Sequence, residues 1–330
     1  MSKSLAEGIK ADAAQGSAGN RHKSPKPRPS IWRDRSSWEL LALCIPALVG
    51  YVLFHYVPMV MAVMIPFKNY KFSQGILKSA WVGLSNFSWL VGSDILTRSM
   101  RNTVLYSVWF LIIGPAVNVL FALLLFEVHR RGALKFYQTV ITFPNFISIV
   151  IVGYITYAIF SPNAGVLNQV RALFGYQPID VYMNTKYWPG ILTVVNLWCG
   201  VGMGSMMYFA SLMGIDTTLF EAAKIDGASR WQQTRFISLP HLIPLVCIFT
   251  ILGVGGIFGG SFDLFYVIPR NIPTLYDTTD VLSTYVFRAL QKGSYSMGAT
   301  VGFFQSTMGL ILVVITNLIV RKMSPENSLF

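Results

Sequence analysis

The most strongly patterned polar stretch of this 330-residue chain lies between two uncharged apolar stretches, Tyr187–Ile215 and Ile237–Phe262. It contains Glu221-Ala222-Ala223, then Asp226-Gly227-Ala228, then Ile237, Leu239 and Pro240. These residue types suit the docking of a soluble protein better than catalysis. Small alanines allow close approach to a partner surface, and Leu219 and Phe220 can serve as apolar anchors in a groove. Glu221 is better placed to cap and orient a helix than to catalyse.

The local sequence predicts two short helices in the loop 216–236. Thr218-Leu219-Phe220-Glu221 fits a capping box, with Asp216 and Thr217 as alternative caps. The first helix should run from Leu219 to Asp226, and Gly227 should supply the left-handed turn that ends it. A second helix should start near Ser229, and Pro240 should mark the start of the next apolar span. The predicted docking residues are Leu219, Phe220, Glu221, Ala222, Ala223, Asp226, Gly227 and Ala228. The alternative is a membrane-surface turn whose residues only cap two helices.

Composition places the chain among membrane proteins. Hydrophobic residues make up 53% of it and charged residues only 12%, whereas soluble domains contain about 25% charged residues. The formal net charge of +12 does not indicate nucleic-acid binding, because the basic residues gather beside apolar spans and no nucleic-acid motif accompanies them. The cysteines Cys44, Cys199 and Cys247 lie in apolar spans, so we expect them to pack rather than form disulfides.

Six apolar stretches are long enough to cross a bilayer as helices, since a span takes about 20 residues. Five of them contain no Asp, Glu, Lys or Arg, and the first contains only Glu39 at its edge. Backbone groups must be satisfied internally in lipid, which predicts an all-α, polytopic membrane protein. The predicted spans are residues 38–63, 103–126, 136–160, 187–215, 237–262 and 299–320.

Lysine and arginine predict the orientation of these spans. They concentrate in the N-terminal tail, around Arg130 and Arg230, and at Arg321 and Lys322. By the positive-inside rule, both termini and the loop 216–236 should be cytoplasmic. Residues 1–36 are rich in Ser, Ala, Gly and Pro, which predicts a disordered basic tail. This tail is either a tether to anionic lipid or only a solvated positive segment, and residues 37–330 form the membrane domain.

No other segment predicts catalysis or a cofactor. No Gly-Lys-Ser or Gly-Lys-Thr sequence occurs, so the chain should not bind ATP itself. No His, Cys and Asp cluster has metal-ligand spacing, and His55, His129 and His241 are isolated near span ends. We therefore expect a non-catalytic protein without its own cofactor or metal.

The loop 216–236 resembles the EAA loop of ABC-importer permeases. The matching residues are Glu221, Ala222, Ala223, Gly227, Ile237, Leu239 and Pro240. Further stretches resemble the sugar permeases of this family, namely Phe54–Met59, Phe67–Tyr70, Trp81–Phe87, Phe262–Phe265, Tyr276–Val281 and Tyr295–Gln305. The resemblance covers most of the chain and points to the oligosaccharide and polysaccharide permeases, those for alginate in particular.

This resemblance implies a six-helix transmembrane subunit of a type I ABC importer in the bacterial inner membrane. The implied partners are a second, homologous permease subunit, two ATPase subunits that dock on the loop 216–236, and a periplasmic solute-binding protein. The ATPase subunits would bind ATP and magnesium. A carbohydrate would then cross the lipid bilayer into the cytoplasm by alternating access.

A carbohydrate pathway needs hydrogen-bonding groups and aromatic faces but little charge. Polar residues in lipid usually face a cavity or a helix contact, so substrate contact and packing both stay open for each candidate. The candidate pathway residues are Asn145, Tyr154, Asn196, Trp198, Tyr208 and Gln305. The loop with Arg270, Asp277, Asp280 and Arg288 either contacts the binding protein or is a plain solvated loop.

Two further alternatives concern packing and function. Gly200/Gly204, Gly255/Gly259 and Gly256/Gly260 have the spacing that lets helices approach closely, either within the chain or against a partner permease, and could let the fifth span bend. An ion-coupled secondary transporter would need intramembrane carboxylates or inverted repeats with broken helices, and the uncharged spans disfavour it. A membrane enzyme would need a reactive cluster at a span end.

Overall fold

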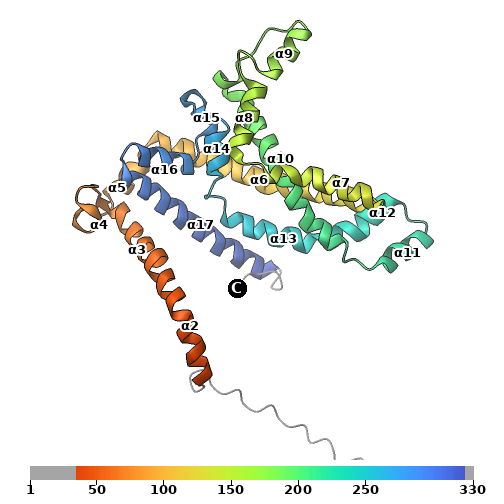
Figure 1. The fold of residues 1–330 in the computed structure, drawn as a ribbon, viewed down its shortest axis with the longest axis horizontal. Coiled ribbons are helices and arrows are strands. Elements are labelled where there is room, and N and C mark those ends of the chain that lie inside the picture. Colours follow the sequence, from red (N-terminus) through yellow and green to blue (C-terminus); the bar gives the residue numbers. More distant parts are fainter. Residues whose placement is uncertain (1–34, 324–330) are drawn as a thin grey trace, which may run out of the picture. The chain divides into compact units, whose positions relative to one another are not determined.

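The computed structural model describes residues 35–323, which are mostly helical (Figure 1). The chain divides into two compact units, which meet in the sequence between Val60 and Met61. In the first unit, the described residues form α2 (Arg35–Tyr51), the π-helical η2 (Val52–Tyr56) and the start of α3 (Val57–Met64). The predicted tail is therefore helical at Arg35 and Ser36, and the rest of it lies outside the described residues.

The second unit begins with a short segment that departs from the all-α expectation. The two-residue strands β1 (Lys68–Asn69) and β2 (Ala80–Trp81) pair in antiparallel fashion, with Lys68 opposite Trp81. Lys68 is buried, and its Nζ donates hydrogen bonds to the carbonyl oxygens of Ile76 at 2.8 Å and Leu77 at 3.0 Å. These bonds close the end of α4 (Gly75–Lys78), which a lysine can do because it satisfies the free carbonyls of a helix C-terminus. The elements around this hairpin are η3 (Ile65–Phe67) and α5 (Ser85–Val91).

Among residues 35–323, five helical segments are long and apolar enough to cross a membrane, and a sixth is a bent pair. The five cover Leu41–Phe67, Leu96–Phe126, Thr185–Leu212, Arg230–Gly255 and Tyr295–Leu318. The elements within and between them are α6 (Asp94–Phe126), α7 (Arg131–Thr142), η4 (Phe143–Phe146), α8 (Ile149–Phe160), α9 (Val166–Leu173), η5 (Val181–Met183), η6 (Thr185–Tyr187) and α10 (Trp188–Leu212). Those that follow are α11 (Thr217–Ile225), α12 (Arg230–Gln233), η7 (Thr234–Ser238), α13 (Leu239–Gly255), α14 (Phe262–Val267), η8 (Pro273–Leu275), α15 (Tyr276–Thr279), α16 (Leu282–Gln291) and α17 (Tyr295–Met323).

The predicted third span, residues 136–160, is wrong as a single straight helix. Its two halves are the segments Arg131–Phe146 and Ile149–Phe160, and they meet at an angle of 96°. Pro144 cannot donate a backbone hydrogen bond, and α7 gives way at Phe143 to the short η4, which ends just before the break. Ser148 then caps α8 by accepting a hydrogen bond from the Val150 amide, so the second half starts as a new helix.

Several other predicted boundaries are also wrong. The helix of the second span, α6, starts nine residues before position 103, because Ser93 caps it through the Leu96 amide. The fourth span ends at Leu212 rather than 215. The fifth begins at Arg230, since α12, η7 and α13 are continuous, and Pro240 therefore lies inside the helical segment. It ends at Gly255, and Gly260 turns the chain with φ +60° before α14. The first and last spans also extend beyond their predicted ends: the first continues to Phe67, and the last begins at Tyr295.

The α6 and α10 helices pack against each other over much of their length, and most of the core forms around this pair. One cluster includes Trp188, Leu192 and Phe265, and a second, nearer the α11 end, includes Ala122, Tyr208 and Leu212. Gly202 lets α10 lie against backbone, since a Cβ there would approach the Ile141 carbonyl to within 3.0 Å. The packed α6–α10 pair therefore positions the loop 216–236, which follows α10.

Candidate functional site

The loop between α10 and α13 forms the predicted pair of short helices, although with a different cap (Figure 1). The helix α11 starts after Asp216, whose Oδ1 accepts a hydrogen bond from the Thr218 amide at 3.0 Å. This bond lowers the pKa of the Asp216 carboxyl from its ordinary value, because it favours the charged form. The predicted Thr218–Glu221 capping box is therefore wrong. Asp216 has the extended backbone of an N-cap, with φ −61° and ψ 122°, and Thr218 is already inside the helix.

The predicted left-handed turn at Gly227 is confirmed, with φ +78°. The Gly227 amide donates to the Lys224 carbonyl at 3.1 Å, and the Ala228 amide donates to the Ala223 carbonyl at 2.9 Å. This pair of bonds is the Schellman motif, which ends a helix by satisfying its last carbonyls. The turn therefore fixes the direction in which the chain leaves α11.

The second short helix, α12, starts after Ser229 as predicted. Ser229 Oγ accepts a hydrogen bond from the Gln232 amide, and Gln232 Oε1 accepts one from the Ser229 amide at 2.7 Å. This is a reciprocal capping box. Gln233 Nε2 also donates to the Ala228 carbonyl at 2.9 Å, which ties the second helix back to the turn.

Two contacts fix this helix pair to the membrane helices. Phe220 packs against the cluster of Tyr208 and Leu212, and its ring lies 5.8 Å from that of Phe126 at the end of α6. Arg230 Nη1 lies 2.6 Å from Glu127 Oε2, one residue beyond the same helix. The expectation that Phe220 is an outward anchor is therefore wrong, because the side chain faces the protein core.

The face of α11 that points away from the protein is apolar. Leu219, Ala222 and Ile225 recur every three residues, and Ile225 is 87% exposed. Of the other predicted docking residues, Glu221, Asp226 and Gly227 are exposed, while Ala223 and Ala228 are half-buried. The sequence interpretation missed Ile225 and, on α12, Trp231, which is 68% exposed. Two large apolar residues in an otherwise polar loop were the signal that could have identified them.

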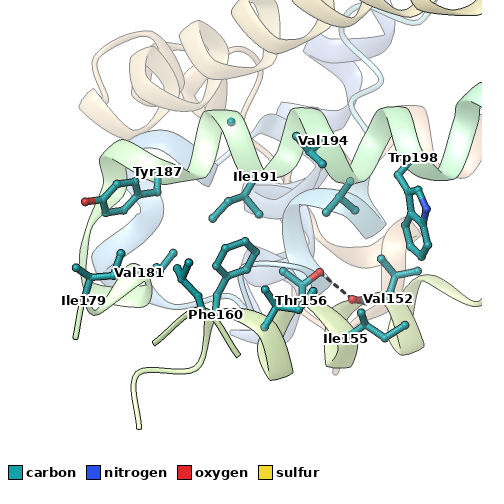
Figure 2. Close-up of a pocket in the computed structure, with 14 residues that line it drawn as sticks. Val152, Ile155, Thr156, Phe160, Ile179, Val181, Tyr187, Ile191, Val194 and Trp198 are labelled. Atoms are coloured by element: carbon teal, nitrogen blue, oxygen red, sulfur yellow. Dashed lines mark hydrogen bonds between the residues drawn. The ribbon is translucent and has the colours of Figure 1, made fainter. Parts of the chain in front are cut away.

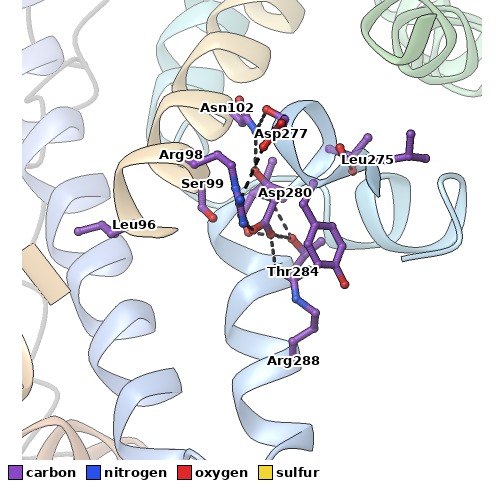
Figure 3. A network of polar contacts seen from close by, with 12 residues as sticks. Leu96, Arg98, Ser99, Asn102, Leu275, Asp277, Asp280, Thr284 and Arg288 are labelled. Carbon is purple, nitrogen blue, oxygen red and sulfur yellow. Dashed lines mark hydrogen bonds and ion pairs between the residues drawn. The ribbon is translucent and has the colours of Figure 1, made fainter. Parts of the chain in front are cut away.

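A second polar site lies at the opposite end of α6, around the fully buried carboxylate of Asp280 (Figure 3). Arg98 Nη2 donates to Asp280 Oδ2 at 3.0 Å, and Arg288 pairs with Oδ1. Thr284 Oγ1 donates to the same oxygen at 2.9 Å, and Asn102 Nδ2 donates to the Asp280 carbonyl at 3.0 Å. A plain solvated loop is therefore wrong for Asp280 and Arg288, because they join α6 to α16.

The candidate pathway residues do not converge on one cavity. Tyr208 is only 2% exposed and packs in the core, which favours packing over substrate contact for this residue. Asn145 Nδ2 donates to the Cys199 carbonyl at 3.3 Å, and Gln305 Nε2 donates to the Gly259 carbonyl at 3.2 Å. Asn196 is half-buried on α10, while Tyr154 is exposed on α8.

Trp198, the remaining candidate, lines an apolar cavity of about 580 Å³ between α8 and α10 (Figure 2). Its walls include Val152, Ile191 and Val194, and the Thr156 hydroxyl donates within its own helix to the Val152 carbonyl at 2.8 Å. A sugar needs several convergent polar groups, and this cavity does not offer them. Within residues 35–323, no group of three or more His, Cys, Asp or Glu could hold a metal ion.

Known proteins share both the sequence and the fold of this chain. Residues 118–326 match the family model described as binding-protein-dependent transport system inner membrane component. The polygalacturonan/rhamnogalacturonan transport system permease protein YteP of Bacillus subtilis is 32% identical over 87% of this chain and 89% of its own length. Protein LplB of the same species is 30% identical over 88% of this chain and 91% of its own length.

A crystal structure of a bacterial ABC transporter involved in the import of the acidic polysaccharide alginate matches with a TM-score of 0.81 and 30% identity. The match covers 90% of this chain and all of that one. A second structure, of a bacterial alginate ABC transporter in complex with its pentasaccharide-bound periplasmic protein, matches with a TM-score of 0.78 and 31% identity over 89% and 96% of the two chains. The family match includes the loop 216–236 and confirms the resemblance found in the sequence. The chain is a multi-pass membrane protein that belongs to the family of binding-protein-dependent transport system inner membrane components, the permease subunits of ABC importers.

Proposed function

We propose that this chain is the permease subunit of an ATP-driven importer that moves an oligosaccharide or polysaccharide into the cytoplasm. The observation that carries the proposal is the exposed apolar face of α11 and α12, mounted rigidly at the ends of two membrane helices. Such a face suits a groove on a soluble subunit. The docking residues on this face are Leu219, Glu221, Ala222, Ile225, Asp226 and Trp231, with Ala223, Gly227 and Ala228 shaping the turn, while Phe220 holds the loop to the core.

The partners of this subunit would be a second, homologous permease subunit, two ATPase subunits and a periplasmic binding protein. In this arrangement the ATPases lie on the α11 side of the inner membrane, which makes both termini cytoplasmic and places Asp280 on the periplasmic side. The ATPases would bind ATP and magnesium, so this chain has no catalytic residue of its own. The carbohydrate class is supported by the relatives, which include a polygalacturonan/rhamnogalacturonan permease and a transporter involved in alginate import.

The contacts of the docking helices suggest how a movement of the ATPase subunits would reach the membrane spans. Phe220 and Arg230 tie the docking helices to the end of α6. The helix α6 has 33 residues and a length of about 50 Å, since each residue adds 1.5 Å. Its other end is fixed to α16 through Asp280. A movement of the docking helices would therefore displace a rigid body that reaches the opposite side of the membrane.

Cysteine crosslinking in the assembled importer tests the proposal. With Cys44, Cys199 and Cys247 replaced by alanine, Ala222→Cys on the exposed face should crosslink to the ATPase subunit. The matched control is Gln291→Cys, which is equally exposed but lies on α16. Ile225→Asp should abolish both the crosslink and the ATP-dependent uptake while the subunit stays folded in the membrane. Uptake and crosslinking that persist in Ile225→Asp would refute the docking role.

A further inference from the structure

A small polar cavity of about 370 Å³ lies between α8 and the end of α14 with the turn that follows it. It is lined by Tyr154, Gly153, Tyr266, Arg270 and Asn271 together with two valines. Unlike the apolar cavity around Trp198, it combines a cation, an amide and aromatic rings. Its volume suits one sugar ring rather than a long chain, because drug-sized ligands occupy pockets from about 300 Å³ upward.

The guanidinium of Arg270 is available to an anionic ligand. The ion pairs of the described residues involve Arg98, Arg230 and Arg288, and Arg270 is not among them. Its guanidinium carbon lies 4.2 Å from the centre of the Tyr157 ring. This stacking orients the planar group and leaves its edge free, and that edge is the part of arginine that binds a carboxylate with two parallel hydrogen bonds.

The backbone beneath Arg270 is held in an uncommon conformation. Arg270 and Asn271 have φ of +58° and +50°, which side-chain-bearing residues rarely adopt. The Asn271 amide donates to the Tyr266 carbonyl at 3.1 Å. Asn271 Oδ1 accepts hydrogen bonds from the Tyr276 hydroxyl at 2.9 Å and from Arg288 at 3.3 Å. The Arg270 amide donates to the Val267 carbonyl at 3.2 Å, so this turn ends α14 in the same way as Gly227 ends α11. The Asp280 network holds the turn in place through Asn271.

The opposite wall of the cavity supplies aromatic surface. Tyr154 and Tyr157 are three residues apart on α8 and therefore share one side of the helix. Tyr154 is 65% exposed, so its ring can pack on a ligand. Gly153 allows the close approach of the two walls, since a Cβ there would lie 2.9 Å from Val267 Cγ1.

We propose that this cavity binds one uronate unit of an acidic oligosaccharide, with Arg270 holding the carboxylate and Tyr154 and Tyr266 facing the sugar ring. The inference rests on the proposed carbohydrate import and specifies the substrate class. A neutral sugar would offer the guanidinium of Arg270, which is exposed, no opposite charge. Arg270 is then the residue through which this subunit selects acidic over neutral sugars.

The test is saturation-transfer NMR with the full permease pair in nanodiscs, without the binding protein. The probes are trigalacturonate, trimannuronate and the methyl ester of trigalacturonate, which has the same sugar rings and no charge. We expect at least one acid to bind and the ester to bind about tenfold more weakly, since a charge-assisted pair is lost. Arg270→Gln should weaken the acid about tenfold and leave the ester unchanged. Arg270→Lys should recover part of the loss, because it keeps the charge without the planar fork.

The matched control is Lys186→Gln, which removes an exposed cation from the same side of the chain outside the cavity. It should bind the acids as the wild type does. Equal binding of acid and ester, or no binding of either acid, would overturn the inference. An Arg270→Gln variant that binds sugar normally but loses affinity for the binding protein would also overturn it, in favour of a protein contact. The crosslinking at Ala222 is independent of all these outcomes, so a failure of the docking role is recognised separately.

Discussion

Arg230 on α12 and Glu127 at the end of α6 form an ion pair of 2.6 Å across 103 positions of sequence. The pair is partly solvated, with 69% and 43% of the two side chains exposed. An exposed ion pair adds only up to about 1 kcal/mol to the free energy of unfolding. Its role is therefore geometric, because it sets the angle at which the docking helices leave the membrane helices.

We expect Glu127→Gln and Arg230→Gln each to reduce substrate-stimulated ATPase activity several-fold, with a change of less than about 1 kcal/mol in the free energy of unfolding. The double charge reversal, Glu127→Arg with Arg230→Glu, should restore most of the stimulation in reconstituted importer. Lys224→Gln removes an exposed cation that is outside the ion pairs of the described residues and serves as the control. A charge reversal that does not recover activity would show that the pair does not orient the loop.

Gly227 is required for its backbone conformation alone. An added Cβ would meet nothing within 4 Å, yet φ is +78°. Gly227→Ala should therefore destabilise the helix pair by about 1 kcal/mol, the cost of a left-handed conformation, and lower ATPase stimulation. Gly227→Asn should be milder, and Gly227→Pro should abolish stimulation because it also removes the amide that bonds Lys224. Gly132→Ala on α7, where φ is ordinary and space is open, is the control. Stimulation that is equal in the alanine and proline variants would contradict this account.

The sequence predicted the loop 216–236 well because its signals are local. Caps, a helix-ending glycine and a second capping serine act within a few residues of one another, so the helix pair needs no distant contact. The cap is the alternative Asp216 rather than Thr218. Phe220 faces the core instead of a partner, and Ile225 and Trp231 were missed. Asp216 and Thr218 are both good N-cap residues, and the backbone at Asp216, set by the end of α10, decided between them.

The rest of the fold could not be predicted from local signals. Hydropathy identifies an apolar run but not its direction, so it did not reveal the 96° break between Phe146 and Ile149 within residues 136–160. Arg98 lies before the predicted second span, and its partner Asp280 is 182 positions away in the sequence, so no local signal indicates this ion pair. Tyr208 illustrates the same limit, because its position on α10 does not say whether it faces a cavity or the core.

Alanine substitution should have opposite effects at Gly200 and Gly202 on α10, although these glycines are only two residues apart. A Cβ at Gly202 would lie within 3.0 Å of the Ile141 carbonyl oxygen and of Thr142 Cα, and neither backbone can rotate away. A Cβ at Gly200 would meet nothing within 4 Å. We expect Gly202→Ala to lower stability by about 3 kcal/mol, the upper range for overpacking, as measured by thermal unfolding in detergent.

Gly200→Ala should leave the isolated subunit unchanged and is the control for Gly202→Ala. If Gly200→Ala weakens assembly with the second permease subunit, measured by co-purification, the open face of α10 is the contact between the two subunits. Equal stability of the two variants would mean that α7 and α10 do not cross at Gly202.

Asp280 should contribute strongly to the stability of the end of the subunit that lies opposite the docking helices α11 and α12. Its buried carboxylate pairs with both Arg98 and Arg288. Asp280→Asn would leave Arg288 without its counter-charge and Arg98 with only the exposed Asp277. Removing one partner of a buried ion pair costs about 3–5 kcal/mol. Asp277→Asn is the matched control, since that side chain is 76% exposed and lies 3.7 Å from the same Arg98; it should change stability by less than about 1 kcal/mol. Because Arg288 also holds Asn271, Asp280→Asn should weaken binding of acidic trisaccharides as well as lower the unfolding temperature. If thermal unfolding of Asp280→Asn matched that of Asp277→Asn, the network would not join α6 to α16, and the turn at Arg270 would need another source of rigidity.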